Sequence, residues 1–305
     1  MSTEGPGWYR GDCHVHTDRS VAGELTPAQV AAAAREFGLD FIAVTEHNTA
    51  DTHGAFEDAG LLVIRGQEMT TRTGHWLALG IRPGETIDWD YGVRDAVIAR
   101  HVSGVHDSGG LCVAAHPHAP YPSGTFMYPF DGFDLVEVWN GQWASDRPWN
   151  ADNETALKEW GRGLSTADRR PAIGSSDTHL TGQIGVPHTV VFAAELSTTA
   201  ILDGLRAGRS WITDSVGVSL SLTATAGDAT AGIGERLESG GAPVRVRLSF
   251  DGVPEGTARF HTERGSFPAP AREWPTTAAE AGFVRAEVRH PDGRMAALTN
   301  PITLA

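Results

Sequence analysis

Six histidines and two carboxylates lie where apolar runs of this 305-residue chain begin or end. Neutral imidazoles and carboxylates are the ligands that divalent transition metals take in proteins, and a set supplied by different runs can surround a small group of ions. The eight predicted metal ligands are His14, His16, His47, Glu68, His75, His116, Asp177 and His179. Together they indicate a metal-dependent hydrolase.

The spacing of these residues strengthens the prediction. His14 and His16 are two positions apart, so on a strand they project from the same face and can bind one ion together. An isolated pair of this kind is a weak signal, but Asp177 and His179 repeat the spacing near the end of the series. His118 forms a similar pair with His116, although the intervening proline breaks strand geometry, so we expect at most a substrate or supporting contact there.

Seven short apolar runs are positioned to deliver these ligands. They are predicted strands at residues 10–16, 40–46, 61–67, 75–81, 111–115, 133–139 and 171–175, most of them continuously apolar, as expected for strands buried on both faces. Helix-like stretches between them favour βα units and a largely parallel sheet or barrel, with active-site residues at the carboxyl ends of the strands. The first helix is expected between Thr26, a suitable N-cap, and Gly38.

The pattern changes after about residue 212. From there the chain has alternating polar and apolar runs separated by Gly, Pro and Asp turns, with no helical period. We therefore predict a metal-binding domain over residues 1–212 and a small, β-sandwich-like antiparallel module over residues 213–305. The module is expected to cover one end of the first domain or to form an oligomer contact, with substrate selection or partner binding as the alternative.

Composition limits the partners. A formal net charge of -14 and the lack of a basic stripe argue against a broad nucleic-acid surface or binding to anionic membranes. The N-terminal segment lacks the basic and apolar regions of a signal peptide, so a cytoplasmic location is expected. The two cysteines, Cys13 and Cys112, lie inside apolar runs and are expected to be buried free thiols.

The combined motifs resemble the PHP (polymerase and histidinol phosphatase) domain of metal-dependent phosphoesterases. The resemblance rests on HVHT at 14–17, TEHN at 45–48, Glu68, His75, AHP at 115–117 and SSDTH at 175–179. The opening WYRGDCHVHT and the closing EVRHPDGRMAALTNPITL are similar to the CehA/McbA-like subgroup. The resemblance implies an α/β fold, a distorted (β/α)7 barrel followed by a small C-terminal antiparallel β module, with two or three divalent metal ions, Mn, Fe or Zn.

The same resemblance implies how the ligands divide. His14, His16, Glu68 and Asp177 would hold one ion, and Glu68 would bridge to a second held by His75 and His116. His47 and His179 would contribute to a third. Relatives often carry an aspartate where this chain has Val21, so either Asp18 or water substitutes there or the third ion binds weakly.

The favoured chemistry is hydrolysis of a phosphoester in a small phosphorylated metabolite or nucleotide, by water activated between two ions. Glu68, His116 and Asp177 are the expected catalytic residues, and Arg19 is a candidate to hold a substrate anion. Hydrolysis of a carbamate, ester or amide is the first alternative, because metal ions activate carbonyl and phosphoryl centres alike. Several arginines in the cavity would favour phosphate, whereas Trp76, Trp139 and Trp143 would favour an apolar carbonyl substrate. A non-catalytic metal-binding protein is the second alternative.

Asp12, Glu46 and Glu137 adjoin the predicted ligands or end a predicted strand. Carboxylates in such positions can hold a ligating imidazole in one tautomer and orientation. Each is therefore a candidate orienting group, against a plain structural role.

Overall fold

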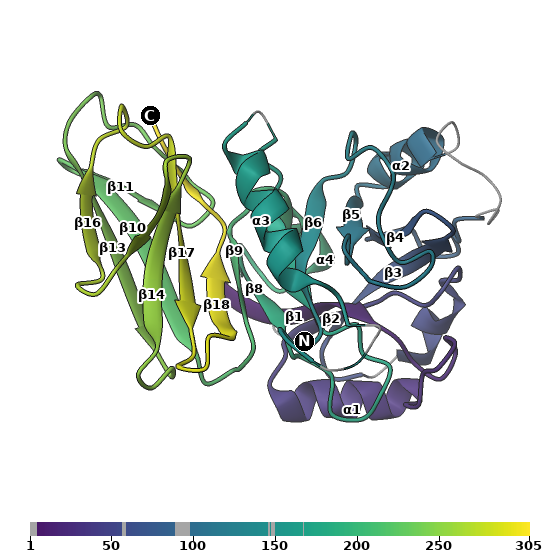
Figure 1. The fold of residues 1–305 in the computed structure, drawn as a ribbon. Helices are drawn as coiled ribbons and strands as arrows, with labels where there is room; N and C mark the ends of the chain where they lie inside the picture. Colours follow the sequence, from purple (N-terminus) through teal and green to yellow (C-terminus); the bar gives the residue numbers. More distant parts are fainter. Residues whose placement is uncertain (1–4, 57–58, 89–97, 146, 148–149, 167) are drawn as a thin grey trace.

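The computed structural model describes residues 5–305 except 57–58, 89–97, 146, 148–149 and 167. All seven predicted strands are present. Figure 1 shows most of them by label. They are β1 (Gly7–Val15), β2 (Phe41–Val44), β3 (Leu62–Thr71), β4 (Gly74–Leu79), β5 (Leu111–Ala115), β6 (Leu135–Asn140) and β7 (Ala172–Ser175). Every residue of β2, β4, β5, β6 and β7 is buried, as their continuous apolar sequences predict.

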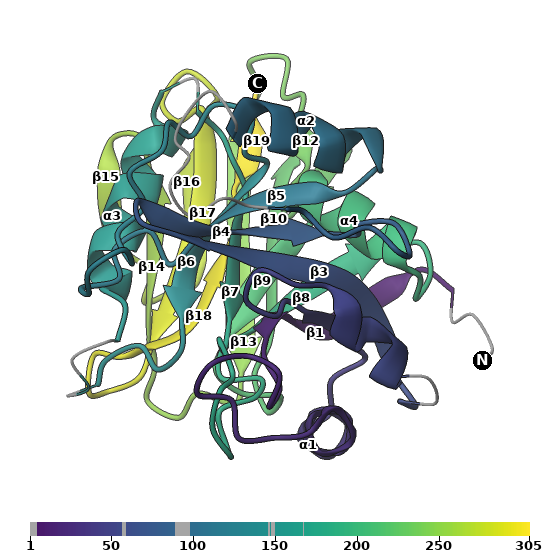
Figure 2. The same ribbon diagram turned by 90° about the vertical axis from the view of Figure 1, so that its right-hand side faces the viewer.

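These strands are neighbours in chain order, but the sheet is mixed rather than parallel. β1, β2 and β3 are parallel, as are β5, β6 and β7, whereas β4 runs antiparallel to both β3 and β5. Figure 2 shows β3, β4 and β5 side by side. The sheet continues past β1 through β8 (His188–Ala193) and β9 (Ser210–Thr213), both antiparallel to their neighbours.

A closed (β/α)7 barrel is not found. Within the described ranges no ladder joins β7 to β1; only an isolated bridge between Val15 and Thr178 links their ends. The β3–β4 connection is a hairpin with no room for a crossover helix, so the regular βα alternation fails there. The structure is a mixed α/β fold with one large sheet.

Helices cover this sheet where the sequence predicts them. α1 (Pro27–Phe37) begins at Thr26, whose side chain forms a capping box with Gln29, and ends at Gly38 in the left-handed conformation with φ 95°. The other described helices are the short η1 (Asp51–Phe56), α2 (Ile98–Asp107), α3 (Asn153–Leu164) and α4 (Thr198–Arg206). None of the helices in the described ranges is long and apolar enough to cross a membrane.

The C-terminal strands form two facing sheets. β11 (Ala229–Gly232), β10 (Ser219–Ala226), β13 (Val244–Asp251) and β16 (Glu273–Thr276) make one sheet in that order. The large sheet supplies the other through β14 (Thr257–Thr262), β15 (Gly265–Pro268), β17 (Phe283–Arg289), β18 (Met295–Thr299), β19 (Ile302–Leu304) and β12 (Arg236–Leu237).

One hydrophobic cluster, including Leu222, Val246 and Phe260, fills the space between these two sheets. β18 pairs with β9, so the large sheet runs through both parts of the molecule (Figure 1). The domain boundary after residue 212 stays a prediction.

Candidate metal centre

All eight predicted ligands lie at one edge of the large sheet. His14 and His16 are at the end of β1, His116 directly follows β5, and Asp177 follows β7. β4 runs in the opposite direction, so its first residues reach the same edge and bring His75 opposite Thr70 of β3. Glu68 lies inside β3, which extends past the predicted strand end at residue 67. Strand ends, one strand start and this residue of β3 therefore assemble the cluster.

Four side-chain atoms converge at its centre. The Nε2 atoms of His14 and His16 lie 3.2–3.4 Å from Glu68 Oε2 and from Asp177 Oδ1. All four atoms are buried, and none has a hydrogen-bond partner among the described residues. The four contacts between imidazoles and carboxylates have the spacing of about 3 Å expected between neighbouring ligands of one divalent cation. His14, His16 and Asp177 offer ligand atoms that all lie within 4.8 Å of one another.

The second oxygen of Glu68 faces other histidines. Glu68 Oε1 lies 3.0 Å from His75 Nδ1 and 3.2 Å from His116 Nε2. Because Glu68 Oε2 belongs to the first group of atoms, one carboxylate lies between two sets of imidazoles. This arrangement fits a bridging ligand between two ions.

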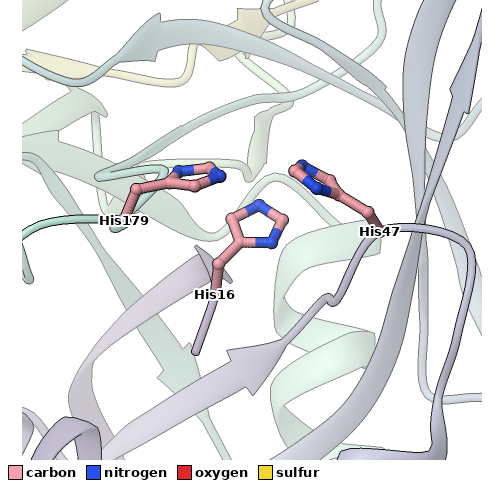
Figure 3. Close-up of side chains that lie close together, drawn as sticks. All are labelled: His16, His47 and His179. Atoms are coloured by element: carbon pink, nitrogen blue, oxygen red, sulfur yellow. The ribbon is translucent and has the colours of Figure 1, made fainter. Parts of the chain in front are cut away.

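A third group consists of His16, His47 and His179, whose ring nitrogens point toward one another (Figure 3). His16 Nε2 also belongs to the first group, so it can complete only one of the two. Val21 is 80% exposed, and Asp18 belongs to none of the potential metal-binding groups in the described part of the chain. The third group therefore lacks a carboxylate of its own.

Glu137 orients a ligand of the first group, which consists of the four converging atoms of His14, His16, Glu68 and Asp177. Its Oε1 lies 3.2 Å from His14 Nδ1, which leaves His14 Nε2 with a lone pair for a metal if the proton is on Nδ1. Its Oε2 accepts hydrogen bonds from the His116 backbone N–H at 2.8 Å and from Asn140 Nδ2 at 3.0 Å. Asn140 Nδ2 also donates to Asp177 Oδ2 at 3.3 Å. Asn140 was not predicted, and its place at a strand end is the one feature that could have pointed to it.

Glu46 acts on His16 through an intervening serine. The Ser20 hydroxyl donates to Glu46 at 2.5 Å and lies 3.0 Å from His16 Nδ1. Donation to the carboxylate leaves the hydroxyl oxygen free to accept the Nδ1 proton, so His16 Nε2 again carries the lone pair. Asp12 instead accepts backbone N–H groups of His14, Ser176 and Gly185, and burial raises the pKa of its carboxyl to about 6.

The electrostatics of the centre are those of a charge-sharing cluster. Burial opposes ionisation of Glu68 and Asp177, but the surrounding histidines hold the pKa of both carboxyls well below their usual range. Burial likewise opposes protonation of His14 and His16, but attraction to the nearby carboxylates is stronger. It raises the pKa of His14 well above its usual value and the pKa of His16 to about 8. A bound cation would replace these shared protons, so metal binding should release protons.

Two ligand positions also carry unusual backbone geometry. His116 has φ 25° and Asp177 has φ 51°, both in the left-handed region that L-residues seldom adopt. Such strain persists only where the surrounding structure enforces it, and it concentrates at functional sites.

The cluster forms the inner end of a cavity of about 830 Å³. Arg147 and Tyr121 are among its lining residues, together with backbone and polar groups from residues 140–142 and 181–183. The side chain of Arg19 is 68% exposed beside Asp18, and Arg19 is not among the described residues that line the cavity. Arg147 was not predicted; its place in the loop after a predicted strand was the available signal.

The remaining candidates lie elsewhere. His118 Nε2 pairs with Glu159 at 2.8 Å, and its side chain belongs to a separate, smaller pocket. Trp76 and Trp139 are almost fully buried, Trp143 is 8% exposed, and none of these three is among the described cavity-lining residues. Cys13 and Cys112 are buried free thiols, as predicted.

Comparisons with known proteins agree with the arrangement. Residues 12–109 match the PHP domain family and residues 162–210 match the family described as PHP-associated. An uncharacterised protein of Methanocaldococcus jannaschii is 27% identical over 154 residues, covering 43% of this chain and 81% of its own length. The CehA/McbA-like assignment stays a prediction.

Similarity to solved structures extends to the C-terminal part. A two-domain protein from Bacteroides vulgatus, described as containing a predicted PHP-like metal-dependent phosphoesterase, aligns over 99% of this chain and 97% of its own, with a TM-score of 0.56 and 16% identity. At this identity the likeness shows a shared fold. A lesion-specific endonuclease from Pyrococcus furiosus aligns over 67% of this chain and 56% of its own, with a TM-score of 0.47 and 13% identity.

Proposed function

We propose that this protein is a metal-dependent phosphoesterase that hydrolyses a small phosphorylated substrate at the edge of its large sheet. The observation that carries the proposal is the convergence of four buried, unpartnered ligand atoms from His14, His16, Glu68 and Asp177. Leaving four such atoms buried without partners would cost several kcal/mol, which a cation would offset. The match of residues 12–109 to the PHP family supports the same chemistry.

Two ions are expected to bind tightly, one between the four converging atoms and one between Glu68, His75 and His116. His47 and His179 are expected to hold a third only weakly, because their group shares His16 with the first. The carboxylate oxygens nearest to them, Glu68 Oε2 at 3.1 Å and Asp177 Oδ1 at 3.4 Å, also belong to the first group. When bound, such ions supply Lewis-acid activation of both a phosphoryl group and an attacking water. Manganese, iron and zinc all suit this mixture of imidazole and carboxylate ligands.

The protein's own residues complete the site. Glu137 and the Ser20–Glu46 pair fix the imidazole tautomers, and Asn140 holds Asp177. Arg147 lines the cavity and is the candidate to bind the substrate anion, in place of Arg19. Neither role requires movement of a metal ligand.

Cavity composition favours phosphate over an apolar carbonyl substrate. The three tryptophans that would have formed an aromatic lining are buried away from the cavity, whereas an arginine lines it. One arginine among the described lining residues is a weaker signal than the several that phosphate binding was expected to show. Carbamate, ester or amide hydrolysis therefore stays the alternative to be tested beside it.

Metal analysis followed by parallel activity panels tests the proposal. We expect about two tightly bound ions per chain and hydrolysis of phosphate mono- or diesters, with aryl carbamates and a short DNA oligonucleotide as competing panels. His116→Ala should abolish activity, whereas the matched control His290→Ala, far along the chain in the C-terminal part, should not. Activity on carbamates alone, or full activity of His116→Ala, would contradict the proposal.

A further inference from the structure

A short loop forms part of the cavity wall. It comprises residues 141–145, follows β6 directly, and is called the cavity-wall loop below. Gly141, Gln142 and Ser145 line the cavity. Between them Trp143 is buried, with its ring edge-on to Trp139 at 5.1 Å between centroids and an interplanar angle of 85°. The loop therefore has one side toward the substrate space and one anchor in the core.

The first turn of α3 holds this loop from behind. The Asn153 side chain accepts from Asn140 N at 2.9 Å and donates to Asn140 O at 3.2 Å and to Gln142 O at 3.3 Å. The neighbouring Glu154 accepts a hydrogen bond from Trp143 Nε1 at 2.9 Å. The anchor and the backbone of the loop thus both depend on the start of α3.

The C-terminal β module holds Glu154 in turn. Arg289 of β17 donates from Nη1 to Glu154 Oε1 at 2.6 Å and from Nη2 to Glu154 Oε2 at 3.2 Å. Its guanidinium carbon lies 5.3 Å from the centroid of the Trp143 ring. A two-pronged arginine–carboxylate pair fixes orientation as well as distance, and the contact with the ring adds a cation–π interaction.

We propose that Arg289 is a positioning residue for the substrate, which acts through Glu154 and Trp143 to fix the cavity-wall loop. The expected effect on substrate binding rests on the proposed function, whereas the expected effect on the loop is independent of it. The C-terminal β module would then be part of the substrate-binding apparatus, because it sets the shape of one cavity wall. The route from Arg289 through Glu154 to Trp143 contains no metal ligand. Asn140, which donates to Asp177, is held by Asn153, so the ions should bind as before.

The decisive variants are Arg289→Ala, Arg289→Lys and Glu154→Gln, with Arg294→Ala as the matched control. The side chains of Arg289 and Glu154 are 22% and 45% exposed, so neither change buries an unpaired charge. Arg294 pairs with Asp292 on an exposed turn and touches neither loop nor helix in the described contacts.

For Arg289→Ala we expect KM to rise about tenfold with kcat and metal affinity changed by less than about twofold, because the loop is displaced while the reacting centre is not. Hydrogen exchange in the peptide covering residues 141–145 should accelerate, and near-UV circular dichroism from Trp143 should change. Arg289→Lys should recover only part of the effect, since an ammonium cannot make the two-pronged contact. Arg294→Ala should resemble the wild type.

Unchanged exchange in residues 141–145 would overturn the inference, whether or not a substrate has been found. Equal acceleration across the whole chain with a lowered Tm would also overturn it, because it would show a general structural role. If no phosphoester is hydrolysed but the loop alone loses protection in Arg289→Ala, the proposed function fails and the positioning role stands.

Discussion

Replacing Glu137 by glutamine tests how the protein presents its metal ligands. The Glu137 carboxylate accepts three hydrogen bonds, from the His14 ring, the His116 backbone N–H and the Asn140 amide. Glutamine keeps the shape but has only one accepting oxygen. If that oxygen faces His14, its NH₂ group meets two donors; if it is turned round, the NH₂ group faces His14 Nδ1 and forces the proton onto Nε2, where the metal should bind.

The magnitude follows from these contacts. Either orientation leaves at least one buried donor without an acceptor or puts a proton on a nitrogen that should bind the metal. Each such loss costs about 1–3 kcal/mol of stabilisation. Loss of such an orienting group typically lowers metal affinity about 10–100-fold, equivalent to about 1.4–2.8 kcal/mol. We therefore expect the dissociation constant of the ion held by His14, His16, Glu68 and Asp177 to rise about 10–100-fold.

Competition with a chromogenic chelator measures the change, using Mn²⁺ and Zn²⁺ separately. The Tm of the metal-free protein is measured in parallel, because loss of buried hydrogen bonds alone would lower it. Glu36→Gln, at an exposed position of α1, is the matched control for the lost charge. A Glu137→Gln protein that binds both metals with wild-type affinity would refute the orienting role, even if its Tm fell.

Three further outcomes are expected. Ser20→Ala should lower metal affinity by about tenfold in the same competition, because its hydroxyl links a ligand imidazole to a buried carboxylate; an unchanged affinity would contradict this. Gly11→Ala should lower the free energy of unfolding, measured in urea, by about 1–3 kcal/mol, because a Cβ there would lie 2.2 Å from the Phe41 ring. The control Gly104→Ala, on an open helix face, should raise the free energy of unfolding slightly. Burial lowers the pKa of His188 to about 4, so between pH 6.5 and 4 only the unfolded chain protonates this histidine. The free energy of unfolding of the wild type should therefore fall over this window by about 3 kcal/mol more than that of His188→Gln. Equal losses in the two proteins would show that His188 is not the cause.

Local sequence predicted much of the strand framework because the signal is short-range. Continuously apolar runs such as LCVAA at 111–115 form strands buried on both faces, and capping residues such as Thr26 fix a helix start within one turn. A ligand one or two residues beyond such a run is carried to the sheet edge automatically. This accounts for His16, His116 and Asp177. Glu68 lies inside β3, and His75 reaches the same edge because β4 runs in the opposite direction.

One failed prediction concerned local spacing. Only residues 68–74 separate two of the predicted strands, whereas a parallel crossover needs a dozen or more, so an antiparallel β3–β4 pair was foreseeable.

Other features could not be predicted because distant contacts decide them. Arg147 and Asn140 could not be ranked from sequence, because an irregular loop and one strand-end amide resemble many others. The Arg289–Glu154 pair joins residues 135 positions apart, and no local pattern carries that information.

The β3–β4 hairpin ties two inner ligands to a single turn. Glu68 pairs with Leu77 and His75 pairs with Thr70, so Glu68 and His75 share a face only in this register. A shift of one residue would turn the whole strand over. Gly74, at φ 113°, has no space for a side chain, since a Cβ would lie 2.5 Å from the Phe126 backbone. The length and the glycine of this turn therefore help to define the metal centre: an insertion or deletion that shifted the register by one residue would turn His75 away from Glu68 and remove an ion-binding face.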